Sequence, residues 1–404
     1  MLKNVVLRRM NAQLFIGVLM GVIVGLIAKD QAVLLGPIGE VFLRLLKMLI
    51  IPLVITSVVL GVINIGKFKK LGKIGSKLGL YIIITTLIAA IIGIMIANRV
   101  GPGYGINYPK QLIEEAKVVV EQPQTLGSIL VEIVPQNLSE AMTDGNILPL
   151  IFFSIFLALA LTGAGKSADP IIKFFESLHV ALIKMINWVM IIAPIGVFTL
   201  IASWIGSVGY NGIKPYLLFI ATVLIGLLIH AILVLPSILM IIGQYSPMLL
   251  LKQLSPALAL AFSTNSSLAT LPITMDCLKK KVKISTRLVN TVTPIGAALN
   301  MDGTALFQAS ATLFIAQIFG FDLTIMQLII IALTATFASF AAAAVPSAGL
   351  ITMTIVLNAV GLPLEGIGLI LIVDRILDMF RTTLNVFSDG IAAVIIARYE
   401  GELI

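Results

Sequence analysis

The chain has 404 residues, of which 59% are hydrophobic and only 11% are charged, and its mean hydropathy is +1.10. This composition excludes a soluble globular protein and predicts an all-α integral membrane protein in the lipid bilayer. The net charge of +8 does not indicate a nucleic-acid partner, because the basic excess lies in short loops between apolar segments. The single cysteine, Cys277, excludes a disulfide framework and a thiolate metal site.

Six apolar segments long enough to cross a bilayer occupy the chain up to about residue 243. No small-residue cleavage site follows the first segment, so we interpret it as a membrane span and not as a signal peptide. Gly17, Gly21 and Gly25 in this span repeat at every fourth position, which allows another helix to approach closely. A lysine-rich loop near residues 67–77 marks the cytoplasmic side. The predicted spans cover about 12–28, 38–66, 78–98, 128–163 (broken near 144–146), 170–205 and 212–243.

Two segments of the second half have apolar arms too short for the ~30 Å bilayer core. They cover about 250–278, with a tip near the serine-rich residues 263–267, and about 324–361, with a tip at 341–349. We interpret both as re-entrant helical hairpins. With a seventh span at about 285–318, broken at 300–304, and a last helix that ends near Arg398, the prediction is eight transmembrane helices plus two hairpins, with both termini cytoplasmic. Paired breaks of this kind are typical of inverted-repeat secondary transporters.

The last helix carries one polar stripe between apolar flanks. At about 100° per residue its members share one face. They are Asp374, Asp378, Arg381, Thr382, Asn385 and Asp389. A charge at bilayer depth costs about 2.5 kcal/mol or more unless it meets a cavity or a partner. The stripe therefore predicts a polar site, the alternative being an internal salt bridge that only fixes helix packing.

The residue types of this site suggest a ligand. Arg381 suits a carboxylate, because its guanidinium binds in a two-pronged geometry. Asp378 requires a cation, either an ammonium group or a metal ion, and Asn385 with the serine-rich tip offers donors to a second carboxylate. Asn300, Asp302 and Asp389 add hard oxygen ligands appropriate to Na⁺. A ligand with one ammonium group and two carboxylates, an acidic amino acid, fits these groups together.

Four motifs together resemble the glutamate transporter family, the dicarboxylate/amino acid:cation symporters. They are residues 300–304 (NMDGT), 266–272, 345–349 and 378–389, and the resemblance covers nearly the whole chain. It implies a transporter and not an enzyme: an alternating-access symporter that couples L-aspartate and/or L-glutamate to Na⁺ at the cell membrane. A proton-coupled symporter of the same family is the alternative.

The resemblance also implies an elevator mechanism in a homotrimer. Spans 1, 2, 4 and 5 would form a fixed scaffold, and spans 3, 6, 7 and 8 with both hairpins would form a moving transport domain. The corresponding boundaries are 1–75 and 126–208 for the scaffold, 76–125 for span 3 with an external loop, and 209–404 for the rest of the transport domain.

Carried onto this chain, the family's substrate site would bind the α-amino group at Asp378, assisted by the Val345 carbonyl. Arg381 would hold the side-chain carboxylate, with Thr304 and Gly349 beside it. The α-carboxylate would contact Ser266, Ser267, Thr382 and Asn385.

Three sodium sites are implied in the same way. One would use Asp389, Asn385, Asn300 and the Gly296 carbonyl, and a second would use Asp302, Asn300, Thr85 and Thr86. A third would lie under the second hairpin tip, near Ser339 and Ala342.

Several positions depart from the family pattern. Ile82 stands where sodium-coupled relatives often have tyrosine, and Ala298 and Ala342 stand where they often have threonine, so those sites would rely on backbone oxygens. A second arginine, which relatives place at the position of Asn265 or Met379, is missing.

Gln308 replaces the glutamate of the proton- and potassium-coupled mammalian members. This substitution argues against H⁺ co-transport and K⁺ counter-transport through that residue.

Other classes fit less well. An intramembrane aspartyl protease would pair Asp302 with Asp378 but needs no adjacent Arg381. In an anion channel Arg381 would line a pore, whereas hairpin tips favour a gated carrier. Among family members, dicarboxylate carriers lack an aspartate at position 378 and neutral amino acid carriers lack an arginine at position 381. His179 and His230, each alone in an apolar run, are expected to be packing or interfacial residues and not ligands.

Overall fold

The computed structural model describes residues 13, 16–17, 19–70, 73–104, 134–143, 147–208, 213–342, 348–364 and 366–402. Across these ranges the regular structure is helical, which confirms the all-α prediction. The expected break near residues 144–146 and most of the second hairpin tip, including Val345, lie outside the described residues.

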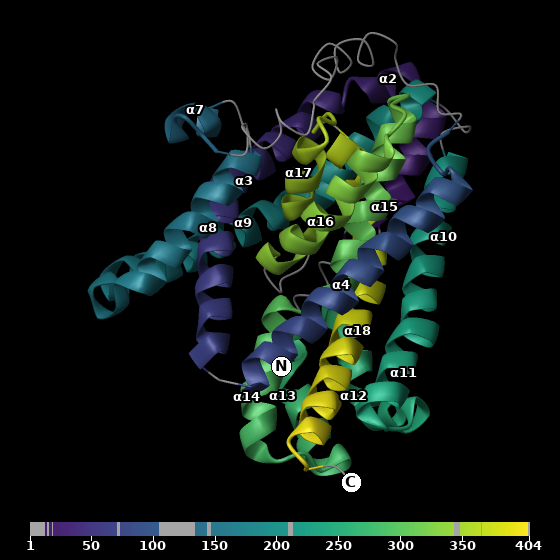
Figure 1. Ribbon diagram of the computed structural model, residues 1–404. Helices are drawn as coiled ribbons and strands as arrows, with labels where there is room; N and C mark the ends of the chain where they lie inside the picture. Colours follow the sequence, from purple (N-terminus) through teal and green to yellow (C-terminus); the bar gives the residue numbers. More distant parts are fainter. Residues whose placement is uncertain are drawn as a thin grey trace.

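One group of helices comes from the first half of the chain. It contains α2 (Asp30–Val33), α3 (Gly36–Lys70), α7 (Leu138–Thr143), α8 (Ile147–Ala164), the short 3₁₀ helix η1 (Gly165–Ala168) and α9 (Asp169–Val208). Helix α3 packs against α8 and α9, and α2 packs against α9. In Figure 1, α3 and α8 lie on one side of the central helices, and α10 lies on the other.

The first predicted span packs closely on α9 through its small residues. A Cβ added at Gly21 would lie 2.9 Å from the Phe198 carbonyl oxygen, and one at Gly25 would lie 2.6 Å from Cβ of Ile205. No larger residue fits at these distances, which confirms that this glycine stripe serves close helix approach.

The remaining helices surround α15 and α18. They are α4 (Lys73–Val100), α10 (Ile213–Ile229), α11 (Leu235–Ile238), α12 (Pro247–Thr264), α13 (Ser267–Cys277), α14 (Thr286–Leu299), α15 (Asp302–Ile318), α16 (Ile325–Ala341), α17 (Ala348–Ala359) and α18 (Gly366–Tyr399). Three π-helical turns join or extend them: η3 (His230–Val234), η4 (Leu239–Gly243) and η5 (Leu278–Val282). Every residue of α15 is buried, which places this helix and the polar face of α18 at the centre of the molecule.

Two helix pairs turn back on themselves where the sequence predicts breaks: α12 packs on α13, and α16 packs on α17. At the first turn Asn265 has a left-handed backbone with φ of 52°, a conformation that asparagine tolerates, and Ser266 caps α13 by accepting a hydrogen bond from Ala269 N at 3.2 Å. The next break, between α14 and α15, falls at Asn300 and Met301. Whether the pairs enter a membrane from opposite faces stays a prediction.

Within the described ranges, four helical stretches are long and apolar enough to cross a membrane: Ile74–Val100, Phe152–Leu182, Lys214–Gly243 and Val373–Tyr399. The prediction of eight spans goes beyond this set and stays a prediction. Large apolar side chains such as Ile191, Leu228 and Ile241 are exposed, as expected of a surface covered by lipid.

Candidate functional site

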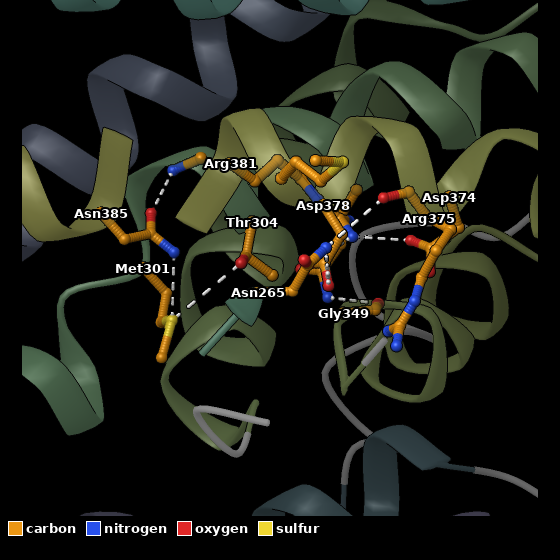
Figure 2. A network of polar contacts seen from close by, with 12 residues as sticks. Asn265, Met301, Thr304, Gly349, Asp374, Arg375, Asp378, Arg381 and Asn385 are labelled. Carbon is orange, nitrogen blue, oxygen red and sulfur yellow. Dashed lines mark hydrogen bonds and ion pairs between the residues drawn. The ribbon is translucent and has the colours of Figure 1, made fainter. Parts of the chain in front are cut away.

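The polar face of α18 lies inside the molecule. Arg381 and Asp374 are each 1% exposed and Asp378 is 8% exposed, so all three charges are withdrawn from solvent. Helix α18 packs against α12, α14 and α15, which bring the two breaks at residues 265–266 and 300–301 to this face. Figure 2 shows the side chains that meet there.

Arg381 holds two carboxylates through a single nitrogen. Its Nη2 donates to Asp374 Oδ1 at 2.6 Å and to Asp378 Oδ1 at 2.8 Å, and the Phe307 ring centroid lies 3.9 Å from the guanidinium carbon. Nε and Nη1 of Arg381 are buried and have no hydrogen-bond partner among the described residues. The internal salt bridge that the sequence analysis gave as the alternative is therefore present, yet it uses only one of the three guanidinium nitrogens.

Both helix pairs, α12–α13 and α16–α17, reach this cluster. From the α12–α13 turn, Asn265 Nδ2 donates to Asp378 Oδ2 at 3.4 Å and to the Arg375 carbonyl oxygen at 3.4 Å. From α17, Gly349 lies so close that an added Cβ would be 3.1 Å from Arg381 Nη1 and 3.1 Å from Thr304 Cγ2. The guanidinium thus lies between α18, α15 and the start of α17.

Gln308 fixes that start of α17. Its Nε2 donates to the Gly349 carbonyl oxygen at 3.0 Å and to Thr352 Oγ1 at 2.6 Å, so the amide links α15 to the second helix pair. A glutamate there would offer no N–H groups when ionised.

The remaining substrate-site candidates lie around the same face. Asn385 Oδ1 accepts from Gly303 N at 2.8 Å, and its Nδ2 faces Met301 Sδ at 3.3 Å, which ties α18 to the start of α15 (Figure 2). Thr382 and Ser267 are buried at 6% and 4% exposure. The Ser266 hydroxyl is engaged as the helix cap described above.

Asp389, one turn beyond Asn385, meets the end of α14. Asn300 Nδ2 donates to Asp389 Oδ1 at 3.0 Å, while Asn300 Oδ1 is buried without a hydrogen-bond partner among the described residues. A Cβ added at Gly296 would lie 2.7 Å from Asp389 Oδ1, so the backbone of α14 abuts this carboxylate. The structure therefore brings together Asp389, Asn300 and Gly296, three of the four residues expected for one cation.

Asp302, which is 0% exposed, joins a second cluster with α4. Its Oδ1 accepts from Thr85 Oγ1 at 3.1 Å and from Thr86 Oγ1 at 2.8 Å, although 217 and 216 residues separate the partners. The threonine pair and the aspartate expected to share a cation thus lie in direct contact.

The opposite oxygen of Asp302 has partners that the sequence did not suggest. Oδ2 accepts from Ser388 Oγ at 2.7 Å and lies 3.3 Å from His230 Nε2. Tyr81 OH lies 3.0 Å from Ser388 Oγ, next to the position where Ile82 replaces a tyrosine. His230 is fully buried, as expected of a packing residue, but its ring also meets a buried carboxylate. A lone histidine in an apolar run gives no local signal of such a partner.

The third expected sodium site has the least support. The Ser339 hydroxyl donates to the Thr336 carbonyl oxygen at 2.8 Å within α16, and Ala342 N donates to the Ser339 carbonyl oxygen at 3.1 Å. Neither contact connects these residues to the two clusters above.

Comparison with known proteins adds independent information. Residues 10–399 match the family described as "Sodium:dicarboxylate symporter family". The chain is 36% identical over 398 residues to the "Proton/sodium-glutamate symport protein" of Bacillus caldotenax, covering 96% of this chain and 94% of that protein. It is 36% identical over 376 residues to the "Proton/glutamate-aspartate symporter" of Escherichia coli K12, covering 91% and 85% of the two chains. It is also 36% identical over 413 residues to "Excitatory amino acid transporter 1" of Ambystoma tigrinum, covering 89% and 76%.

Proposed function

The chain belongs to the sodium:dicarboxylate symporter family, a family of multi-pass membrane transporters and not of enzymes, and from this premise we propose that it carries acidic amino acids across the cell membrane in symport with Na⁺. The substrate would be L-aspartate and/or L-glutamate. The printed names of the relatives, which specify glutamate, aspartate or excitatory amino acids, support this class of substrate.

The observation that carries the substrate assignment is the arrangement around Arg381. A buried guanidinium with Nε and Nη1 unsatisfied requires an acceptor, and a ligand carboxylate beside Gly349 and Thr304 would supply it. Asp378 accepts a hydrogen bond from Nη2 of the same guanidinium and would receive the ligand's ammonium group. Ser266, Ser267, Thr382 and Asn385 would contact the α-carboxylate, with the Val345 carbonyl at the ammonium group.

Two other buried carboxylates, Asp389 and Asp302, support cation coupling. Asp389 with Asn300, Asn385 and Gly296 would hold one Na⁺, and Asp302 with Thr85, Thr86 and Asn300 would hold another; Ser339 and Ala342 would serve a third. The names of the Bacillus caldotenax and Escherichia coli relatives mention protons, so a proton-coupled symporter is the alternative proposal.

The proposed architecture is an elevator in a homotrimer, with both termini cytoplasmic. Its scaffold would be residues 1–75 and 126–208, and the transport domain would be 76–125 and 209–404. In support, α3, α8 and η1 share an apolar cluster of their own, which consists of Val59, Ile63, Ala158, Leu161 and Ala168. Crosslinking in membranes should trap trimers, and a monomer that still transports would count against the trimer.

The decisive experiment is uptake by purified protein in proteoliposomes. Labelled aspartate and glutamate would be supplied while Na⁺, H⁺ and K⁺ gradients are imposed separately. We expect uptake that follows an inward Na⁺ gradient. Uptake driven by a pH gradient without Na⁺ would favour the proton-coupled alternative, and no uptake of either amino acid would reject the substrate class.

A further inference from the structure

The cluster around Asp302 contains more residues than a cation site of Asp302, Asn300, Thr85 and Thr86 requires. Among the described residues its carboxylate has four polar partners, and they divide by oxygen atom. Thr85 and Thr86, both from α4, contact Oδ1, whereas Ser388 from α18 and His230 from η3 contact Oδ2.

The two sides differ in what their partners can do. A threonine hydroxyl can donate or accept, so it can turn its hydrogen away and offer a lone pair to a cation. For Thr85 the structure contains the alternative acceptor: the Tyr81 carbonyl oxygen lies 3.0 Å from its Oγ1. Thr85 is therefore able to change from a hydrogen bond with Asp302 to a cation contact without movement of the backbone.

On the other side His230 faces Oδ2 through Nε2, at 3.3 Å. An ionised carboxylate has acceptor oxygens alone, so toward it this nitrogen acts as a donor. Nδ1 of this ring is buried without a hydrogen-bond partner among the described residues. His230 is 0% exposed and begins the π-helical turn η3, a local irregularity that is frequent at functional sites.

Ser388 has a further polar partner in Tyr81, which also comes from α4. Tyr81 OH lies 3.0 Å from Ser388 Oγ and 3.2 Å from the Ser388 carbonyl oxygen. The hydroxyl that holds Oδ2 is thus itself held by the same helix, α4, that supplies Thr85 and Thr86.

We propose that His230 and Ser388 are positioning residues that hold Asp302 by Oδ2, so that Oδ1 and the two threonine hydroxyls are presented to the coupled cation. This inference rests on the proposed function, since it concerns the cation that the transporter would carry. Outer partners that orient a ligand typically change metal affinity by about 10–100-fold when they are removed.

The test is calorimetric titration of L-aspartate into purified full-length protein in lipid nanodiscs at a series of Na⁺ concentrations. His230→Ala and Ser388→Ala should each raise the Na⁺ concentration needed for half-maximal aspartate binding by about tenfold or more. At saturating Na⁺ the aspartate affinity should return to within about threefold of wild type, because the substrate contacts are intact. A merely structural role would lower aspartate affinity at every Na⁺ concentration.

Two further variants keep the test decisive. His230→Gln retains an N–H donor and should lie between wild type and His230→Ala, which also covers the case in which the alanine variant does not fold. His179→Ala is the matched control, because His179 lies on α9 with Thr56 Oγ1 3.4 Å from its Nδ1, far along the chain from the cluster. It should leave the Na⁺ dependence unchanged.

The outcomes separate the two proposals. Wild-type protein that binds aspartate equally well without Na⁺ would reject the proposed coupling and this inference with it. Wild-type protein that needs Na⁺, together with folded His230→Ala and His230→Gln variants that need no more of it, would reject the inference alone.

Discussion

Two pairs of buried carboxylates lie at or beside the polar face of α18, and their partners differ. Asp374 and Asp378 share the guanidinium of Arg381, a permanent cation. Asp302 and Asp389 instead have hydroxyl, amide and imidazole partners. In the part of the chain that the structure describes, neither of them lies within ion-pair distance of a lysine or arginine.

This difference indicates what each cluster requires from outside. Burying an ionised carboxylate costs several kcal/mol unless a charge compensates it. The Arg381 cluster contains its own cation and has unsatisfied N–H groups, so it can accept an anion. Among the described residues Asp302 and Asp389 have no lysine or arginine within ion-pair distance, so their sites suit small cations supplied from solution.

The largest expected effect follows from breaking the first cluster. Arg381→Cys should weaken binding of acidic substrates by about 2–5 kcal/mol, the usual cost of removing one partner of a buried charge pair. Serine and alanine should bind comparatively better, and Arg381→Lys should also fail because a point charge does not reproduce the planar fork. A competition series with aspartate, glutamate, serine and succinate on purified variants would measure these preferences.

The Arg381→Cys experiment needs a matched control, since the variant also removes the guanidinium that Asp374 and Asp378 contact. Adding Asp374→Asn to Arg381→Cys removes one of the two carboxylate charges and should recover stability without recovering aspartate binding. If Arg381→Cys retains the wild-type preference for aspartate over serine, Arg381 is a structural ion-pair partner and the side-chain carboxylate is recognised elsewhere.

An intermediate effect is expected at Asp389 and Asp302. Asp389→Asn removes the charge that a cation would compensate, so it should raise the Na⁺ concentration for half-maximal aspartate binding roughly tenfold or more, equivalent to about 1.4 kcal/mol. Asp302→Asn should act in the same direction. Titrating Na⁺ at fixed aspartate measures both, and an unchanged Na⁺ dependence in Asp389→Asn would remove that residue from the ion site.

The smallest effect is expected from a single methyl group at Gly296. Because an added Cβ would lie 2.7 Å from Asp389 Oδ1, Gly296→Ala should displace this carboxylate and raise the Na⁺ requirement by less than Asp389→Asn does. Alanine favours a helix over glycine by about 1 kcal/mol, so loss of helix propensity would not explain the change. Gly79→Ala is the control, since nothing lies within 4 Å of a Cβ at that position; equal shifts in the two variants would contradict the steric argument.

Much of this arrangement could be predicted from residues close together in the sequence. Asp374, Asp378 and Arg381 lie seven and three positions apart on one helix, so helical periodicity alone brings them to one face. The interruptions between helices at 265–266 and 300–301 are likewise marked by local runs of polar residues within apolar segments. Such signals depend only on spacing and composition, and they identified the polar face and its position.

The contacts that give Asp302 its partners were decided by the tertiary structure. Asp302 meets His230 across 72 residues, Thr85 across 217 and Ser388 across 86, and Tyr81 meets Ser388 across 307. Periodicity places a residue on a face but does not determine which other helix covers that face, because this depends on how α4, η3, α15 and α18 pack together. The sequence by itself therefore determined that the centre is charged and that Arg381 shares a face with Asp374 and Asp378, while only the packing decided that Asp302 and Asp389 meet hydroxyl, imidazole and amide groups.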